Sequence, residues 1–126
     1  MLRGSVEVAC GPSSMVRRVR GIEAPDDLAI YIGDLDKVDL GSLGLRVFKV
    51  VNPGFSNRAV YIGGLPHVSL EDYLASMVIN DEYYVGLLRY FNLRHVDWEL
   101  VEALMANAGL ANLYVKVREA ADRFNA

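Results

Sequence analysis

The hydrophobic and polar positions of this chain follow two periods, one in each half. Before residue 66, apolar residues form short runs bounded by glycine, proline or aspartate, and several runs alternate with polar residues. This pattern predicts strands at 5–10, 28–32, 45–51 and 58–62, with a loop at 33–44. Because the connections are short, the pattern favours antiparallel pairing, since parallel strands need a long crossover.

From residue 69 the apolar spacing changes to about 3.6 residues, which predicts helices. Ser69 is a candidate N-cap with Asp72 in the reciprocal position of a capping box, and Asp97 is placed to cap a later helix. Residues 80–82 interrupt the first apolar stripe, so this stretch forms either two helices or a single kinked one. Gly109 fits the position that follows the last turn of a helix.

The order of strands first and helices second is typical of the α+β class. With 126 residues the chain has room for one domain with a hydrophobic core. We therefore predict a single domain over 1–126, strand-rich at 1–66 and helical at 69–125. In this fold an antiparallel sheet of four or five strands is covered on one face by three or four helices.

One stretch of the chain occurs twice. Residues 29–40 recur as residues 59–70, with seven of twelve positions identical and no gap. Each copy contains a short apolar strand that stops at a glycine, Gly33 or Gly63, and we expect both glycines to adopt backbone angles that other residues resist. The match indicates either a duplicated unit or a chance similarity.

The repeat also bears on residues 15–20, whose pattern fits a helix or a strand. Val16–Val19 precedes the first copy roughly as Val47–Val50 precedes the second. Since the latter segment is a convincing strand, we interpret both as first arms of hairpins, which makes the sheet a duplicated hairpin unit.

Side chains alternate across a strand, so the same repeat suggests a second apolar face of the sheet. If Ile30 and Ile62 face the helices, Tyr31 and Tyr61 point to the other face, where Phe48 joins them. We predict that this face mediates self-association as a homodimer or larger symmetric assembly. The alternative is that its aromatic residues stack on single-stranded bases.

The helix pair 97–108 and 110–124, joined through Gly109, resembles a helix-turn-helix, although it departs from that pattern at Met105 and Arg118. The resemblance implies DNA contact by outward-facing residues of the second helix and an inward position for Val115; the outward residues are Asn112, Lys116 and Arg123. The alternative is a simple αα-hairpin that closes the core.

Charge weakens the nucleic-acid interpretation. The net charge is −3, and residues 69–126 carry five basic and nine acidic side chains. This is the opposite of the basic balance that phosphate contacts require. No apolar run is long enough to cross a membrane, and the single cysteine favours a reducing, intracellular compartment.

No residues are spaced as in a catalytic or cofactor motif. Cys10 has no base near it in sequence, and the two histidines, His67 and His95, are too far apart along the chain for a zinc motif. We therefore predict a non-enzymatic protein without a catalytic residue, metal ion or cofactor.

The amino-acid usage carries one further hint. The chain has no glutamine or threonine, and its basic residues are ten arginines and three lysines. This bias resembles small proteins of hyperthermophilic crenarchaea and of the viruses that infect them, in particular a globulovirus-like archaeal virus. The resemblance implies residence in the host cytoplasm. The sequence thus favours a small, self-associating binding or interaction protein, with a nucleic-acid-binding regulator using a degenerate helix-turn-helix at 97–124 as the alternative.

Overall fold

The computed structural model describes residues 6–125 and confirms the α+β class. Within these residues one sheet contains five strands: β1 (Val8–Cys10), β2 (Asp27–Tyr31), β3 (Arg46–Val50), β4 (Val60–Ile62) and β5 (Leu65–His67). The first predicted strand is found as β1, whereas Ser5, its expected first residue, lies outside the described residues.

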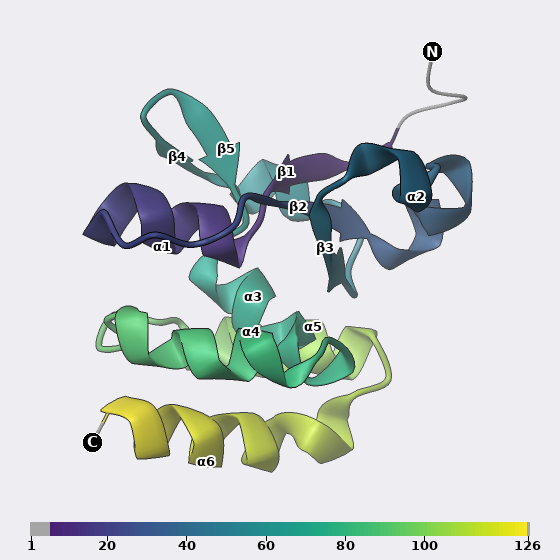
Figure 1. The fold of residues 1–126 in the computed structure, drawn as a ribbon. Helices are drawn as coiled ribbons and strands as arrows, with labels where there is room; N and C mark the ends of the chain where they lie inside the picture. The colour runs from purple at the N-terminus through teal and green to yellow at the C-terminus, as the bar shows by residue number, and fades with distance from the viewer. Residues whose placement is uncertain (1–5, 126) are drawn as a thin grey trace.

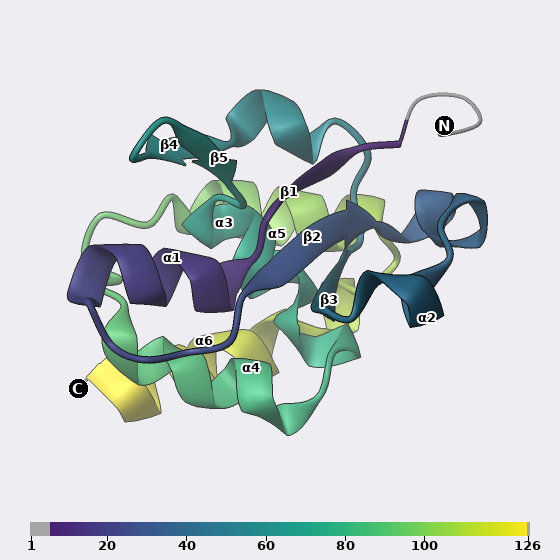
Figure 2. The same cartoon turned by 45° about the horizontal axis from the view of Figure 1, so that its top comes forward.

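Helices cover one face of the sheet in two layers (Figures 1 and 2). α3 and α4 lie against the sheet, α5 packs beside α3, α6 is the outermost helix on the same side, and α1 runs beside the sheet. The α-helices are α1 (Pro12–Arg20), α2 (Leu40–Leu43), α3 (Leu70–Ser76), α4 (Glu82–Gly86), α5 (Trp98–Asn107) and α6 (Tyr114–Asn125). Short 3₁₀ turns join them: η1 (Ile32–Lys37), η2 (Phe55–Arg58), η3 (Met77–Ile79), η4 (Leu87–Tyr90) and η5 (Ala111–Leu113).

The sheet is mixed, so the prediction of purely antiparallel pairing was wrong. Its strand order is β3-β2-β1-β5-β4. β1–β2 and β4–β5 are antiparallel, whereas β2–β3 and β1–β5 are parallel. The parallel β2–β3 pair needs a long crossover, and residues 32–45 supply it. The segment 33–44, predicted as a loop, lies largely in η1 and α2 of this crossover.

Residues 12–20 form helix α1, so the interpretation of 16–19 as a strand was wrong. Pro12 occupies the start of the helix, where its missing N–H is harmless, and Gly21 ends it at φ +66°. The first turn of α1 is capped by a residue that is distant in sequence. The carboxyl group of Asp27 accepts hydrogen bonds from the N–H groups of Ser13 (3.1 Å) and Ser14 (3.0 Å). This long-range cap cannot be seen in a local pattern.

The repeat is not a duplicated hairpin. β2, from the first copy, lies between β1 and β3, while β4, from the second, is an edge strand, and β3 pairs with β2 instead of β4. Gly63 has the predicted left-handed backbone at φ +60°, but Gly33 does not. Gly33 is instead crowded: a Cβ there would lie 2.4 Å from Cε2 of Tyr31.

The predicted helix caps at Ser69 and Asp97 are confirmed, whereas the last helix, predicted from residue 110, begins only at Tyr114 after the 3₁₀ turn η5. The Ser69 side chain accepts from the Asp72 N–H at 3.1 Å, and that of Asp97 accepts from the Leu100 N–H at 3.1 Å. Asn80 and Asp81 separate η3 from α4, so the interrupted stripe forms two helices, and Gly109 follows α5 at φ +75°.

Asp72 contributes more than a capping box predicts. Its buried carboxylate accepts from both Nε and Nη2 of Arg58 at 2.9 Å, and also from the Ser69 hydroxyl at 2.8 Å. This bidentate pair fastens η2 onto the first turn of α3.

The core between sheet and helices is aromatic. Phe48 of β3 is fully buried, with its ring centroid 4.8 Å from that of Tyr84 and 5.8 Å from that of Tyr73. The Tyr73 ring extends this aromatic cluster to Phe91, with ring centroids 5.2 Å apart. Tyr73 also donates its hydroxyl hydrogen to the carbonyl oxygen of Tyr84, which ties α3 to α4.

Candidate functional site

The β4–β5 hairpin presents the most exposed apolar side chains of the sheet. Gly63 and Gly64, at φ +60° and +80°, form the two-residue turn between the strands. Around them Tyr61 is 70% exposed, Val60 46% and Leu65 40%. We had not predicted β5, although a Gly-Gly pair between apolar runs is a recognised hairpin signal.

The backbone of β4 faces outward at its centre. Tyr61 lies opposite Pro66 in the antiparallel β4–β5 pair. Since proline has no N–H, this is a pair without mutual hydrogen bonds, and the N–H and C=O groups of Tyr61 point away from β5. Among the described strands none lies on that side of β4.

The opposite edge of the sheet is closed by side chains. On β3, the Lys49 N–H donates to Oδ1 of Asn80 at 2.9 Å, and Nδ2 of Asn80 donates to the Lys49 carbonyl at 3.1 Å. Just beyond the strand, the Val51 N–H donates to Oγ of Ser76 at 3.1 Å. One amide side chain thus takes the place of a neighbouring strand, which protects this edge from further pairing.

An apolar groove of about 280 Å³ runs between the hairpin and α1. Val60 and Ile62 line it from β4, and Met15 and Val19 line it from α1. Since side chains alternate across a strand, Tyr61 projects to the other side of the hairpin. β4 therefore offers an open backbone edge with apolar side chains on both faces.

The predicted face of Tyr31, Phe48 and Tyr61 does not exist as an exposed surface. Phe48 is buried in the core, and Tyr31 is partly buried against it, because both lie on the helix-covered side of the sheet. Ile30 points to the other side, opposite to its predicted orientation. The assignment was inverted because period two identifies alternate faces without indicating which one the helices cover. Of the three aromatic residues Tyr61 is the most exposed, at 70%.

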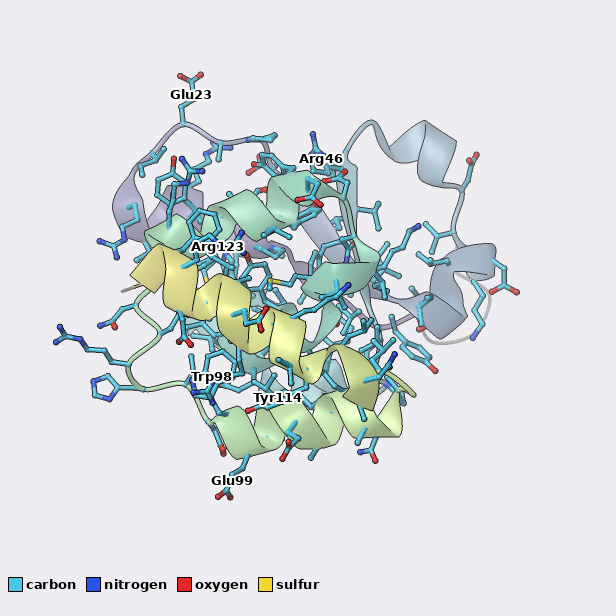
Figure 3. The ribbon with its side chains drawn as sticks, turned by 90° about the horizontal axis from the view of Figure 1, so that it is seen from below. Glu23, Arg46, Trp98, Glu99, Tyr114 and Arg123 are labelled. Atoms are coloured by element: carbon cyan, nitrogen blue, oxygen red, sulfur yellow. The ribbon has the colours of Figure 1, made fainter. Side chains whose placement is uncertain are left out.

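The helix pair α5 and α6 carries the predicted nucleic-acid contacts on its outside. Asn112, Lys116 and Arg123 are exposed, and Figure 3 shows Arg123 near the C-terminal end of α6. Val115, however, is 63% exposed, so its inward placement in a helix-turn-helix was wrong. Val117 and Ala121 occupy the inward positions of α6, on the opposite side of the helix from Val115.

Arg118, which does not fit the helix-turn-helix pattern, has a packing role. Its guanidinium lies 4.3 Å from the centroid of the Trp98 ring, and its Nη1 donates to the Tyr114 hydroxyl at 3.3 Å. Trp98 and Tyr114 meet edge to face between α5 and α6 (Figure 3). A cation over an aromatic face is a stabilising contact, and here it joins the two helices.

Cys10 and His67 occupy neighbouring positions on the parallel strands β1 and β5. Burial raises the pKa of the Cys10 thiol and lowers the pKa of the His67 imidazole. Nδ1 of His67 contacts the Leu65 carbonyl at 2.9 Å, while its buried Nε2 has no hydrogen-bond partner. A protonated thiol beside a neutral imidazole is not an activated nucleophile.

Residues 6–125 contain no cluster of three or more histidine, cysteine or acidic side chains that could hold a metal ion. In the same range no helix has the length and apolar character needed to cross a membrane. Comparison with protein-family models, curated proteins and solved structures finds no match. We therefore infer the function of this protein from its own geometry.

Proposed function

We propose that this protein is a non-enzymatic binding protein that associates with a second copy of itself through the edge strand β4. The observation that carries the proposal is the contrast between the two edges of the sheet. Asn80 satisfies the backbone of β3, whereas β4 leaves the N–H and C=O of Tyr61 directed outward. Charged residues and proline usually protect a free edge, and Val60–Ile62 contains neither.

A twofold axis beside Tyr61 suits this edge. Antiparallel pairing of β4 with its copy puts Tyr61 opposite the same residue and lets the two exchange both N–H···O=C bonds. The register then sets Val60 opposite Ile62 of the other copy on the face of the apolar groove. Such an interface uses the same patch on both subunits, which is the commonest symmetry of soluble oligomers.

Tyr61→Pro tests this proposal. The substitution removes the outward N–H but no bond to β5, so the monomer keeps its fold while dimer affinity falls about tenfold or more. Sedimentation velocity over a concentration series measures the association, and thermal unfolding verifies the fold. Tyr61→Lys should act in the same direction, because a charge at an edge opposes pairing.

Val115→Asp is the matched control, since Val115 is a similarly exposed apolar residue on α6. It should leave the association unchanged. A wild-type protein that stays monomeric at every concentration would refute the proposal. Equal loss of association in Val115→Asp would move the interface to α6.

Nucleic-acid regulation through α6 is the second candidate, and the exposure of Asn112, Lys116 and Arg123 favours it. Glu119 and Asp122 on the same helix are exposed as well and would repel phosphates. If Lys116 and Arg123 both contact phosphate, we expect the logarithm of the affinity for duplex DNA to fall with the logarithm of the salt concentration with a slope of about two. Fluorescence anisotropy measures it, with Lys116→Ala expected to lower the slope by about one. If the protein does not bind duplex DNA even at low salt, this candidate function is refuted.

A further inference from the structure

A second pocket, with a volume of about 530 Å³, lies on the other side of the end of α1 from the groove beside β4. It is formed where the end of α1, η4, the segment 91–94, the start of α5 and the later turns of α6 meet. Figure 3 shows this side of the molecule, with Trp98 on α5 below α6. Pockets of about 300–1,000 Å³ are typical of small-molecule sites.

Three arginines line this pocket: Arg20, Arg89 and Arg94. All three are exposed, and none lies within ion-pair distance of a carboxylate among the described residues. The only acidic residue in the lining is Asp122. The pocket therefore has an excess of positive charge inside a chain whose net charge is −3.

Two of the guanidinium groups are held in place without being neutralised. Nε of Arg20 donates to the Tyr90 carbonyl at 2.9 Å, and Nε of Arg89 donates to the Gly86 carbonyl at 3.0 Å. Main-chain carbonyls fix each group by one nitrogen and leave the two terminal nitrogens available. That paired arrangement matches two oxygens of a phosphate group.

The lining also includes four apolar residues, of which Trp98 is the most exposed. Phe91 and Leu93 are nearly buried, and Ala121 forms part of the wall from α6. Trp98 is held by the guanidinium of Arg118 over its ring and by the edge-to-face contact with Tyr114. An apolar or aromatic body can lie against such walls while its charged end meets the arginines.

We propose that this pocket binds a small molecule with a phosphate or diphosphate group on an apolar or aromatic body, of the nucleoside diphosphate class. The arginines take the phosphate oxygens, and Trp98 contacts the body. This site lies apart from Tyr61 and does not depend on the association of two copies.

Trp98 is the only tryptophan of the chain, so its fluorescence reports directly on the pocket. Adenosine diphosphate at low salt should change this signal saturably, with calorimetry giving the same affinity. Inorganic pyrophosphate should bind about tenfold more weakly, because it lacks the body, and adenosine about tenfold more weakly or worse, because it lacks the charge. Raising the salt concentration should weaken binding of both phosphate compounds.

Arg94→Ala should weaken binding of adenosine diphosphate about tenfold or more, since a hydrogen bond to a charged group is worth about 1.5–3 kcal/mol. Lys116→Ala removes one exposed cation at the other end of α6 and should leave the affinity unchanged. Absence of saturable binding by all three compounds overturns the proposal. Equal affinity for adenosine and adenosine diphosphate, or equal loss in both variants, overturns the role of the arginines.

Discussion

Replacing Asp27 by alanine is expected to destabilise the protein by about 3 kcal/mol or more, because it leaves several buried donors without an acceptor. Asp27 is 2% exposed, and its carboxyl group accepts from the N–H groups of Ser13 and Ser14, from the Ser14 hydroxyl and from the Tyr84 hydroxyl. Burial and the neighbouring carboxyl group raise the pKa of Tyr84, so its hydroxyl keeps the proton that it donates. Urea unfolding followed by circular dichroism measures the loss.

The neighbouring residue supplies the control. Asp26 pairs with Arg17 at 2.7 Å, but both side chains are more than half exposed. A surface ion pair of this kind contributes about 0–1 kcal/mol, so Asp26→Ala should change stability little. Equal effects of the two alanine variants would contradict the role given to Asp27 as the link between α1, β2 and α4.

Phe48→Ala is expected to cost about 3–5 kcal/mol, the range for removing a large aromatic side chain from a packed core. The ring has no exposed surface and contacts Tyr73 and Tyr84, so its loss leaves a cavity between the sheet and the helices. The same unfolding experiment measures it, with Tyr61→Ala as the control because Tyr61 is largely exposed.

This comparison also separates the two interpretations of the aromatic strand residues. If Phe48 belonged to a surface used for association, Phe48→Ala would lower the dimer affinity and leave the monomer stable. We expect the reverse: a destabilised monomer for Phe48→Ala, and weakened association with normal stability for changes at Tyr61. A loss below about 1 kcal/mol for Phe48→Ala would contradict the core position.

The two proposed surfaces lie on either side of the end of α1. The apolar groove beside β4 and the arginine-lined pocket share Arg20, Phe91 and Asn92 in their linings. Substitutions at Arg94 and Tyr61 avoid this shared strip, so each tests one surface without altering the lining of the other.

The resemblance to proteins of hyperthermophilic archaea and their viruses stays a prediction.

Features that depend on near neighbours could be predicted from the sequence. The caps at Ser69 and Asp97 and the glycine after α5 act over three or four residues, and the change of apolar period near residue 69 separates the strand-rich part from the helical part. These signals were enough to predict the α+β class, since the apolar period of a helix or strand can be recognised from neighbouring residues alone.

Features that depend on distant contacts could not be predicted. Residues 12–20 are helical partly because Asp27 binds their first turn, and the strand order follows from a crossover that lacks a strong helical pattern of its own. The inverted faces of β2 have the same origin, because alternation is symmetric and only packing against the helices decides which face is buried.

Both candidate surfaces belong to the second group. Nothing in Val60–Ile62 marks it as the open edge until Asn80, far along the chain, is seen to close the other edge. Likewise Arg20 is far from Arg89 and Arg94 in sequence, and the three come together only where α1, η4 and the segment 91–94 meet. Local spacing along the chain was sufficient to predict the helices and strands themselves. The open edge, the buried faces and the pockets were decided by long-range packing, because it brings together residues that no periodic pattern in the sequence connects.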